Sequence, residues 1–172
     1  MKKVTGVCYG RFDGEKVVHP KRGLGAGYVD ILLRNGFKQI RDPGFTQGMG
    51  TAYFIKNWTG ESDEHFMLCN LLLDEIRKYT PRVEYNLTVF PDMAFGLDDG
   101  RWVALEIEDK RKSLEELASK LTKASNYSDF FYLVTDWELL EHYREYAPTF
   151  TRRSVQDKIR SYFRGESQAL NR

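Results

Sequence analysis

The stretch of sequence that decides the fold is residues 90–116, FPDMAFGLDDGRWVALEIEDKRKSLEE. Two largely apolar runs, 92–97 and 102–108, are separated by the turn-forming residues 98–101, Asp-Asp-Gly-Arg. An Asp-Gly pair between two such runs is a strong signal for a β-hairpin. The stretch ends on Ser-Leu-Glu-Glu, a capping box that satisfies the free amides of a new helix. It therefore predicts two paired strands followed directly by a helix.

The elements on either side of this stretch complete a mixed pattern. Upstream, apolar residues recur at helical spacing after Ser62 or Asp63, and downstream residues 130–134 form an apolar run suited to a buried strand. The elements expected after residue 60 are a helix over 62–78, strands over 83–89, 92–97 and 102–108, a helix over 113–124, a strand over 130–134, and helices over 137–146 and 155–163. Their order, αβββαβ with a helical C-terminus, predicts a mixed α/β domain over residues 61–172.

Residues 1–60 are predicted to form a small N-terminal appendage. A short helix within 23–36 ends at Asn35-Gly36, and strands are expected over 37–41 and 51–55 around a turn region rich in Pro and Gly. Helix, strand, glycine-rich turn and strand is the order found in the second half of a winged helix. An ordinary β-hairpin appendage fits the same pattern.

Three acidic residues are expected to meet at the hairpin. Because side chains alternate along a strand, Glu106 and Glu108 share one face of the strand over 102–108. Asp92, on the neighbouring strand of the hairpin, adds a third carboxylate. An unpaired carboxylate is costly to bury, and clustered hard oxygen ligands suit Mg²⁺ or Mn²⁺. The sequence therefore predicts a divalent-metal site with Asp92 and Glu106 as ligands.

The charge is unevenly distributed along the chain. The 26 basic and 25 acidic residues give a net charge of +1, but residues 1–60 carry 10 basic and 4 acidic side chains, a net +6. Residues 61–109 carry 4 basic and 12 acidic side chains, a net -8, and residues 110–172 carry 12 and 9, a net +3. An acidic middle segment between basic ends suits a protein that binds a cation through its acidic residues and a polyanion through its basic ends. Charges on solvated faces produce the same asymmetry without any such role.

Three motifs carry a resemblance to a known family. Phe90-Pro91-Asp92, Glu106-Ile107-Glu108 and the helix-opening Lys112-Ser113 together resemble the PD-(D/E)xK nuclease superfamily, in which these features lie within an αβββαβ core. The resemblance implies a restriction-endonuclease-like fold. Within the superfamily the chain is most similar to replication-relaxation and mobile-element proteins, in which a winged helix precedes a helix bearing His and Asn, here His65 and Asn70.

The resemblance implies a role for each matching residue. Asp92, Glu106, Glu108 and Lys112 form the expected catalytic set, and Asp92 and Glu106 hold the metal ion. The third residue of the triplet is Glu108 rather than lysine. Either Lys112 therefore supplies the ammonium from the start of the helix, which we favour, or the triplet is the E-x-K sequence that ends at Lys110.

These features together predict a metal-dependent DNA endonuclease of a phage or mobile element, acting on duplex or branched DNA. The expected nucleic-acid contacts are Lys110, Arg111, Arg152 and Arg153. A two-fold homodimer is expected by analogy, because cutting two strands usually needs two sites. The alternatives are a catalytically inactive nuclease fold that binds DNA and regulates replication, and a small-molecule or partner-binding domain in which the acids are incidental.

The sequence also bears on location. No apolar run approaches the ~18 residues of a membrane span, and the start of the chain lacks the apolar segment of a signal peptide. Cys8 and Cys69 suit buried thiols in a reducing compartment better than a disulfide framework or a zinc site. We therefore expect a cytoplasmic protein without membrane contact.

Overall fold

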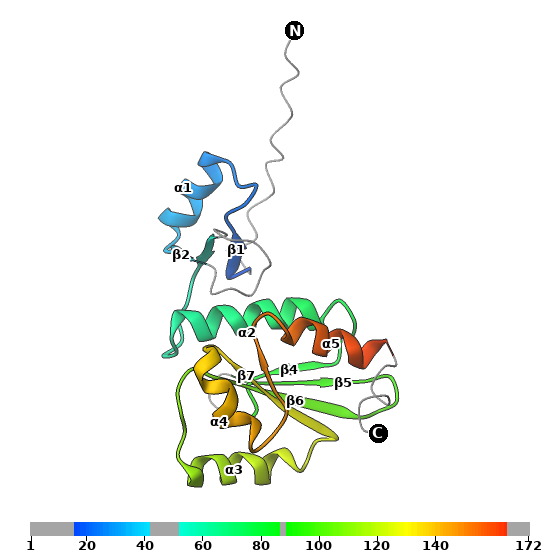
Figure 1. Cartoon of the computed structure of the whole chain (residues 1–172). Coiled ribbons are helices and arrows are strands. Elements are labelled where there is room, and N and C mark those ends of the chain that lie inside the picture. Colours follow the sequence, from blue (N-terminus) through cyan, green and yellow to red (C-terminus); the bar gives the residue numbers. More distant parts are fainter. Residues whose placement is uncertain (1–15, 42–51, 87–88, 165–172) are drawn as a thin grey trace.

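The computed structural model of the chain describes residues 16–41, 52–86 and 89–164 (Figure 1). Within these ranges the chain forms five α-helices and two β-sheets, a mixed α/β fold. No helix in the described ranges is long and apolar enough to cross a membrane.

The larger sheet has five strands in the order β4-β5-β6-β7-β8. The strands are β4 (Val83–Tyr85), β5 (Met93–Gly96), β6 (Trp102–Glu108), β7 (Asp129–Val134) and β8 (Thr149–Thr151). The first three pair antiparallel, whereas β6, β7 and β8 run parallel. Gly100, in the turn between β5 and β6, has a φ of 89°, a conformation that glycine adopts without steric cost.

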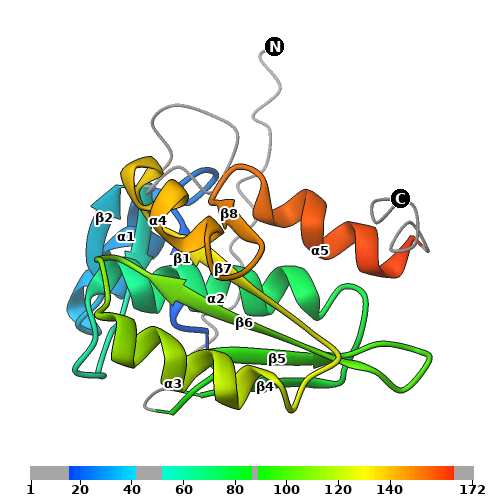
Figure 2. The same ribbon diagram turned by 60° about the horizontal axis from the view of Figure 1, so that its bottom comes forward.

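Helices cover both faces of this sheet, as Figure 1 shows. They are α2 (Asp63–Ile76), α3 (Leu114–Ala124), α4 (Leu140–Arg144) and α5 (Val155–Phe163). One core joins α2 and α5 to Val103, Leu105 and Ile107 of β6. A second core joins α3 and α4 to Ala104 of the same strand. Since side chains alternate along a strand, Glu106 and Glu108 lie on the face that α3 covers, with α3 in front of the sheet in Figure 2.

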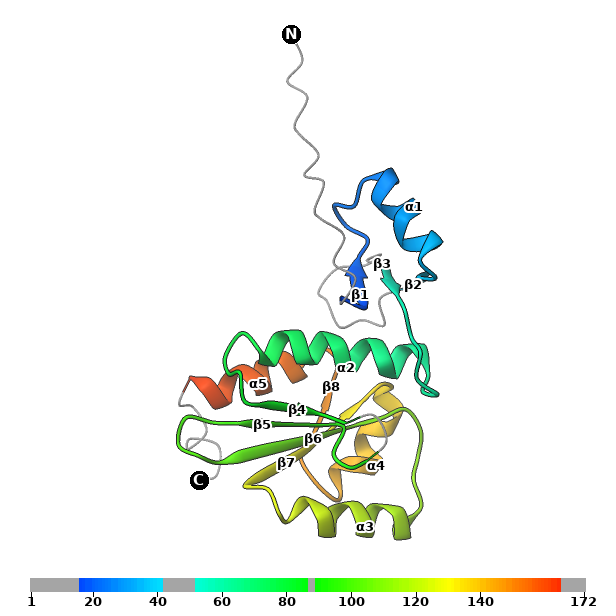
Figure 3. The ribbon, with the colours of Figure 1, turned by 180° about the vertical axis from the view of Figure 1, so that it is seen from behind.

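The N-terminal part is a three-stranded antiparallel sheet with one helix. Its elements are β1 (Val18–Pro20), α1 (Ala26–Arg34), β2 (Lys38–Arg41) and β3 (Ala52–Ile55). The strand order is β1-β3-β2. Tyr53 and Ile55 pack against Phe66 and Met67 of α2, so this sheet lies on the α2 side of the larger sheet (Figure 3).

Most of the predicted elements are confirmed in type and place. The expected strand over 83–89 is shorter, since β4 ends at Tyr85 and residues 87–88 lie outside the described ranges. The expected helix over 137–146 begins as a 3₁₀ turn, η1 (Trp137–Leu139), before α4. The strands β1 and β8 were not expected, because each has three residues and contains or follows a proline. The expected turn region over 42–50 falls outside the described residues.

The capping box at the start of α3 offers a test of local stability. Glu116 N–H donates to Ser113 Oγ (3.2 Å), and Ser113 N–H donates to Glu116 Oε2 (2.9 Å). We expect Ser113→Ala to lower the free energy of unfolding by about 1 kcal/mol, because it removes the acceptor for a free helix amide. Urea denaturation measures the change. The control is Ser119→Ala, the same replacement in the exposed middle of α3, which should be neutral or slightly stabilising; equal losses in both variants would contradict the capping role.

Candidate functional site

A pocket of about 610 Å³ opens where β6 ends and the chain turns toward α3. Its lining includes His65, Asp92, Glu106, Lys110, Lys112 and Lys120. The pocket therefore brings together three of the residues expected to be catalytic and one lysine that was not expected. Glu108, the remaining acid, is buried beside it and is linked to it through Lys120.

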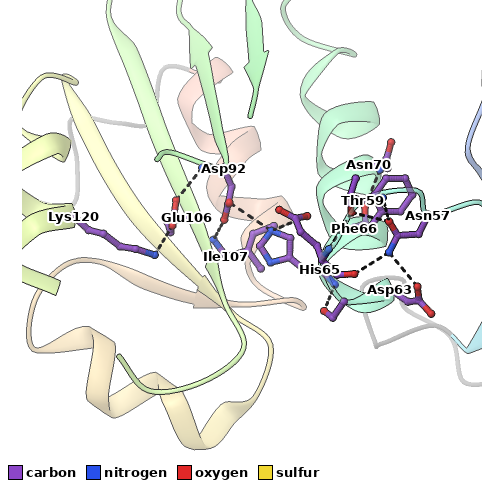
Figure 4. Close-up of polar contacts among 12 residues, drawn as sticks. Asn57, Thr59, Asp63, His65, Phe66, Asn70, Asp92, Glu106, Ile107 and Lys120 are labelled. Atoms are coloured by element: carbon purple, nitrogen blue, oxygen red, sulfur yellow. Dashed lines mark hydrogen bonds and ion pairs between the residues drawn. The ribbon is translucent and has the colours of Figure 1, made fainter. Parts of the chain in front are cut away.

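Asp92 and Glu106 are fixed to each other through the backbone of the hairpin (Figure 4). The Asp92 N–H donates to Glu106 Oε2 (2.9 Å), and Ile107 N–H donates to Asp92 Oδ2 (2.7 Å). Glu106 therefore accepts from the backbone of Asp92, just before β5, and Asp92 accepts from the β6 residue that follows Glu106. The expected proximity of the two acids is confirmed, and their orientations are set by main-chain donors.

Lys120 of α3 binds both acids of the E-x-E sequence. Its Nζ lies 2.5 Å from Glu106 Oε1 and 2.6 Å from Glu108 Oε1. Glu106 and Glu108 are only 6% and 2% exposed, and the Lys120 side chain is 20% exposed. Removing one partner from a buried ion pair leaves an uncompensated charge, so the three side chains depend on one another.

Burial and the neighbouring charges together set the pKa values of this cluster. Burial, together with the nearby charge of Asp92, raises the pKa of Glu106 to about 7, although the Lys120 ammonium acts against this rise. Burial also raises the pKa of Glu108, opposed by Lys120 and Lys112. Burial lowers the pKa of Lys120, but the two carboxylates outweigh it and the net pKa is raised. Lys120 is therefore held in its charged form.

His65 and Glu61 approach the site from the start of α2. His65 Nε2 lies 3.5 Å from Asp92 Oδ1 and 3.7 Å from Glu61 Oε2. Burial lowers the pKa of His65, but its hydrogen-bonding contact with Asp92 and the charges of Asp92 and Glu61 raise it overall. Asn70, the other residue that the resemblance singled out, donates to the Phe66 carbonyl within α2 (2.8 Å).

Lys110 and Lys112, the two lysines that were expected at the site, both line the pocket. The ion pairs to Glu106 and Glu108 are made by Lys120 instead. Lys110 lies exposed on the loop after β6, where its carbonyl accepts from the Tyr143 hydroxyl (2.7 Å). Lys112 is half-buried and close enough to Glu108 for its charge to oppose the rise in the pKa of that residue. Lys112 was expected to supply the ammonium beside the acids, whereas Lys120 forms those ion pairs in the structure; a catalytic role for Lys112 stays a prediction.

The arginines named as nucleic-acid contacts lie in different environments. Arg111 is exposed on the loop after β6, and Arg153 is exposed after β8. Arg152 forms an ion pair with Glu64 of α2, and its side chain is only 18% exposed. Its guanidinium is therefore engaged with an acid of the same chain, and its expected contact with nucleic acid stays a prediction.

Lys120 is the residue that sequence reasoning missed, although a signal for it exists. Leu117, Leu121 and Ala124 form the buried stripe of α3, at the i, i+4 and i+7 spacing of a core-facing helix. Lys120 lies three residues after Leu117 and four before Ala124, inside that stripe. A lysine on the buried face of a helix needs an anionic partner, and two acids were already expected on the opposing strand.

The acids of the pocket offer two adjacent carboxylates as metal donors. The described residues contain no group of three or more His, Cys, Asp and Glu side chains positioned to share one ion. Mg²⁺, however, is commonly held by one or two carboxylates together with waters and substrate phosphates. Asp92 and Glu106, adjacent and lining the pocket, provide such a pair.

Comparisons of this chain with protein-family models, with curated proteins and with solved structures found no match. The interpretation of the site therefore depends on its own geometry and chemistry.

The raised pKa of Glu106 makes stability depend on pH. Ionised Glu106 is less favourable in the folded chain than in the unfolded chain, so stability falls as pH rises from about 4.5 to about 7. We therefore compare the free energy of unfolding of the wild type with that of Glu106→Gln. The difference should fall by about 3 kcal/mol across this pH range, which is the free energy that corresponds to the rise of the Glu106 pKa from 4.5 to about 7. Urea denaturation in EDTA at several pH values measures it. A difference that stays constant from pH 5 to pH 8 would contradict the burial of an ionisable Glu106.

Proposed function

We propose that the protein is a metal-dependent nuclease that hydrolyses phosphodiester bonds in DNA. The observation that carries this proposal is the Lys120 ammonium between Glu106 and Glu108, beside Asp92, at the edge of an open pocket. Two acids and a fixed ammonium facing a pocket combine metal ligands with a group that stabilises negative charge on a phosphate.

The order of elements supports the same function. From α2 to β7 the chain runs helix, three antiparallel strands, helix and a strand parallel to the third. We infer that this segment is a restriction-endonuclease-like core. The strand order β1-β3-β2 and the helix before β2 support a winged-helix-like N-terminal unit in the same way.

The residues of the pocket divide into three roles under this proposal. Asp92 and Glu106 hold Mg²⁺ or Mn²⁺, which when bound supplies positive charge at the scissile phosphate and makes a water molecule more acidic. Lys120 presents its ammonium toward the same place and is kept charged by its two acids. Lys110 and Arg111, exposed beside the pocket, attract the phosphate backbone.

A catalytically inactive DNA-binding protein is the second candidate function. It is favoured by one observation, since Lys120 already forms ion pairs with both acids of the E-x-E sequence. In such a protein the cluster stabilises the fold, and the basic residues bind DNA without cleaving it. Cleavage of DNA by the wild-type protein separates the two candidates, because the inactive protein binds DNA without cutting it.

We expect Lys120→Met to reduce the rate of DNA cleavage in Mg²⁺ on the order of 10²-fold or more, the loss typical of one group that stabilises a transition state. Turnover is measured on supercoiled plasmid, with circular dichroism to establish that the variant is folded. Lys123→Met is the matched control, because Lys123 also lies on α3 and lines the pocket but is exposed.

Asp92→Asn keeps the shape of Asp92 and should abolish cleavage through loss of the metal-binding charge.

Two outcomes would contradict this assignment. Full activity in Lys120→Met would show that the ammonium between the acids is structural only. A large loss in Lys112→Ala, with little change in Lys120→Met, would return the catalytic role to the residue that the sequence favoured.

A further inference from the structure

Tyr132 of β7 carries a hydroxyl group that is buried without a hydrogen-bond partner. The side chain is fully buried, and none of the described residues lies within hydrogen-bonding distance of its hydroxyl. A buried polar group without a partner is rare and costs free energy, so its position calls for a physical reason. The neighbouring Tyr143 shows the usual arrangement, because its buried hydroxyl donates to the Lys110 carbonyl (2.7 Å).

The Tyr132 hydroxyl lies in the electrostatic field of the ion pairs that Lys120 makes with Glu106 and Glu108. Tyr132 pairs with Glu106 in the parallel register of β6 and β7, so both side chains leave the sheet on the face that α3 covers. Burial and the charge of Glu108 raise the pKa of Tyr132 to about 12, with smaller effects from Lys120 and Glu106. Tyr132 therefore keeps its proton, and its neutral hydroxyl can accept a hydrogen bond as well as donate one.

The ring of Tyr132 is fixed by its neighbours. The rings of Phe130 and Tyr143 each have their centroids 4.8 Å from it, at interplanar angles of 79° and 54°. Leu117 of α3 belongs to the same core. Lys120, by contrast, has a long flexible side chain that is 20% exposed. A new contact between the two residues therefore requires movement of the lysine and not of the tyrosine.

Under the proposed function, Glu106 is shared by the metal ion and Lys120. Its Oε2 accepts the Asp92 N–H, and its Oε1 contacts the Lys120 ammonium at 2.5 Å. A divalent cation on this carboxylate repels the ammonium, because like charges at such short range interact strongly in a partly buried site. Glu108, at 2.6 Å, keeps Lys120 nearby, but the ammonium has three N–H groups and the one that leaves Glu106 needs another acceptor.

We propose that the Tyr132 hydroxyl accepts a hydrogen bond from Lys120 when a divalent cation takes Glu106 as a ligand. Tyr132 is thus a positioning residue that acts through Lys120. Its hydroxyl lacks a partner in the metal-free protein because Lys120 there contacts Glu106 instead. With Glu108 and Tyr132 as acceptors, the third N–H of the ammonium remains for the scissile phosphate. The inference rests on the metal site of the proposed function.

The test is Tyr132→Phe, which removes the hydroxyl and keeps the ring. In EDTA its midpoint of urea denaturation should equal or exceed that of the wild type, because the lost hydroxyl had no partner. Binding of Mn²⁺ should nevertheless weaken on the order of 10-fold, the loss expected for one hydrogen bond to a charged group. The affinity is measured from the electron paramagnetic resonance signal of free Mn²⁺, without DNA and above the Glu106 pKa of about 7.

Tyr162→Phe is the matched control, because Tyr162 is also a buried tyrosine but its hydroxyl donates to Asp129. This variant should show the opposite pattern, with a lower urea midpoint and an unchanged affinity for Mn²⁺. A double-mutant cycle with Lys120→Met tests whether Tyr132 acts through the lysine. Tyr132→Phe should have no further effect on Mn²⁺ affinity in that background, because no ammonium is left for the hydroxyl to accept from.

Three results would overturn the proposal. Unchanged Mn²⁺ affinity in Tyr132→Phe would show that the hydroxyl has no part in metal binding. A lower urea midpoint in EDTA would show that the hydroxyl already has a partner, such as a bound water, in the metal-free protein. An equal loss of Mn²⁺ affinity with and without Lys120 would show that Tyr132 does not act through the lysine.

Cleavage assays in Mg²⁺ separate these failures from a failure of the nuclease function. A wild type that cuts DNA, together with unchanged Mn²⁺ affinity in Tyr132→Phe, would overturn the role of Tyr132 alone. A wild type that loses Mn²⁺ affinity through Tyr132→Phe but cuts no DNA would support the role of Tyr132 and overturn the nuclease. A wild type that binds no Mn²⁺ and cuts no DNA would overturn both.

Discussion

A partly buried lysine ammonium held between two buried carboxylates is the interaction on which the site depends. Lys120 lies 2.5 Å from Glu106 and 2.6 Å from Glu108, which are almost fully buried. Glu106 and Glu108 lie on the same face of β6. Without the Lys120 ammonium, both carboxylates would be desolvated with no compensating charge. The cluster also joins α3 to β6, so the same ion pairs that stabilise the buried acids fix a helix against the sheet.

The rest of the fold places partners around this contact. The hairpin of β5 and β6 sets Asp92 against Glu106 through backbone donors, which needs no side-chain freedom. The start of α2 brings His65 to Asp92 from the other side of the site. The loop after β6 is tied to α4 through the hydrogen bond from Tyr143 to the Lys110 carbonyl, which fixes the backbone beneath the basic side chains of that loop.

Local signals predicted most of the fold, whereas the site required knowledge of which elements face each other. The Asp-Gly turn and the capping box at Ser113 act within a few residues, so they fix β5, β6 and α3 from sequence alone. Alternation along β6 likewise placed Glu106 and Glu108 on one face. Lys120 was missed because proximity in sequence favoured Lys112, while the packing of α3 over β6 brings in a residue twelve positions after Glu108. Glu61 lies only four residues before His65, but it was missed because the tertiary contact between His65 and Asp92 is what brings this local pair to the site.

Cleavage of DNA by the wild-type protein, with and without a divalent cation, is the measurement that tests the central claim most directly. Supercoiled plasmid, linear duplex, single-stranded DNA and a four-way junction are incubated with Mg²⁺ or Mn²⁺, and in parallel with EDTA. If Asp92, Glu106 and Lys120 form a metal-dependent nuclease site, at least one of these DNAs is cut with the cation and none is cut in EDTA. Cutting that persists in EDTA, or four intact DNAs in both cations, would contradict it.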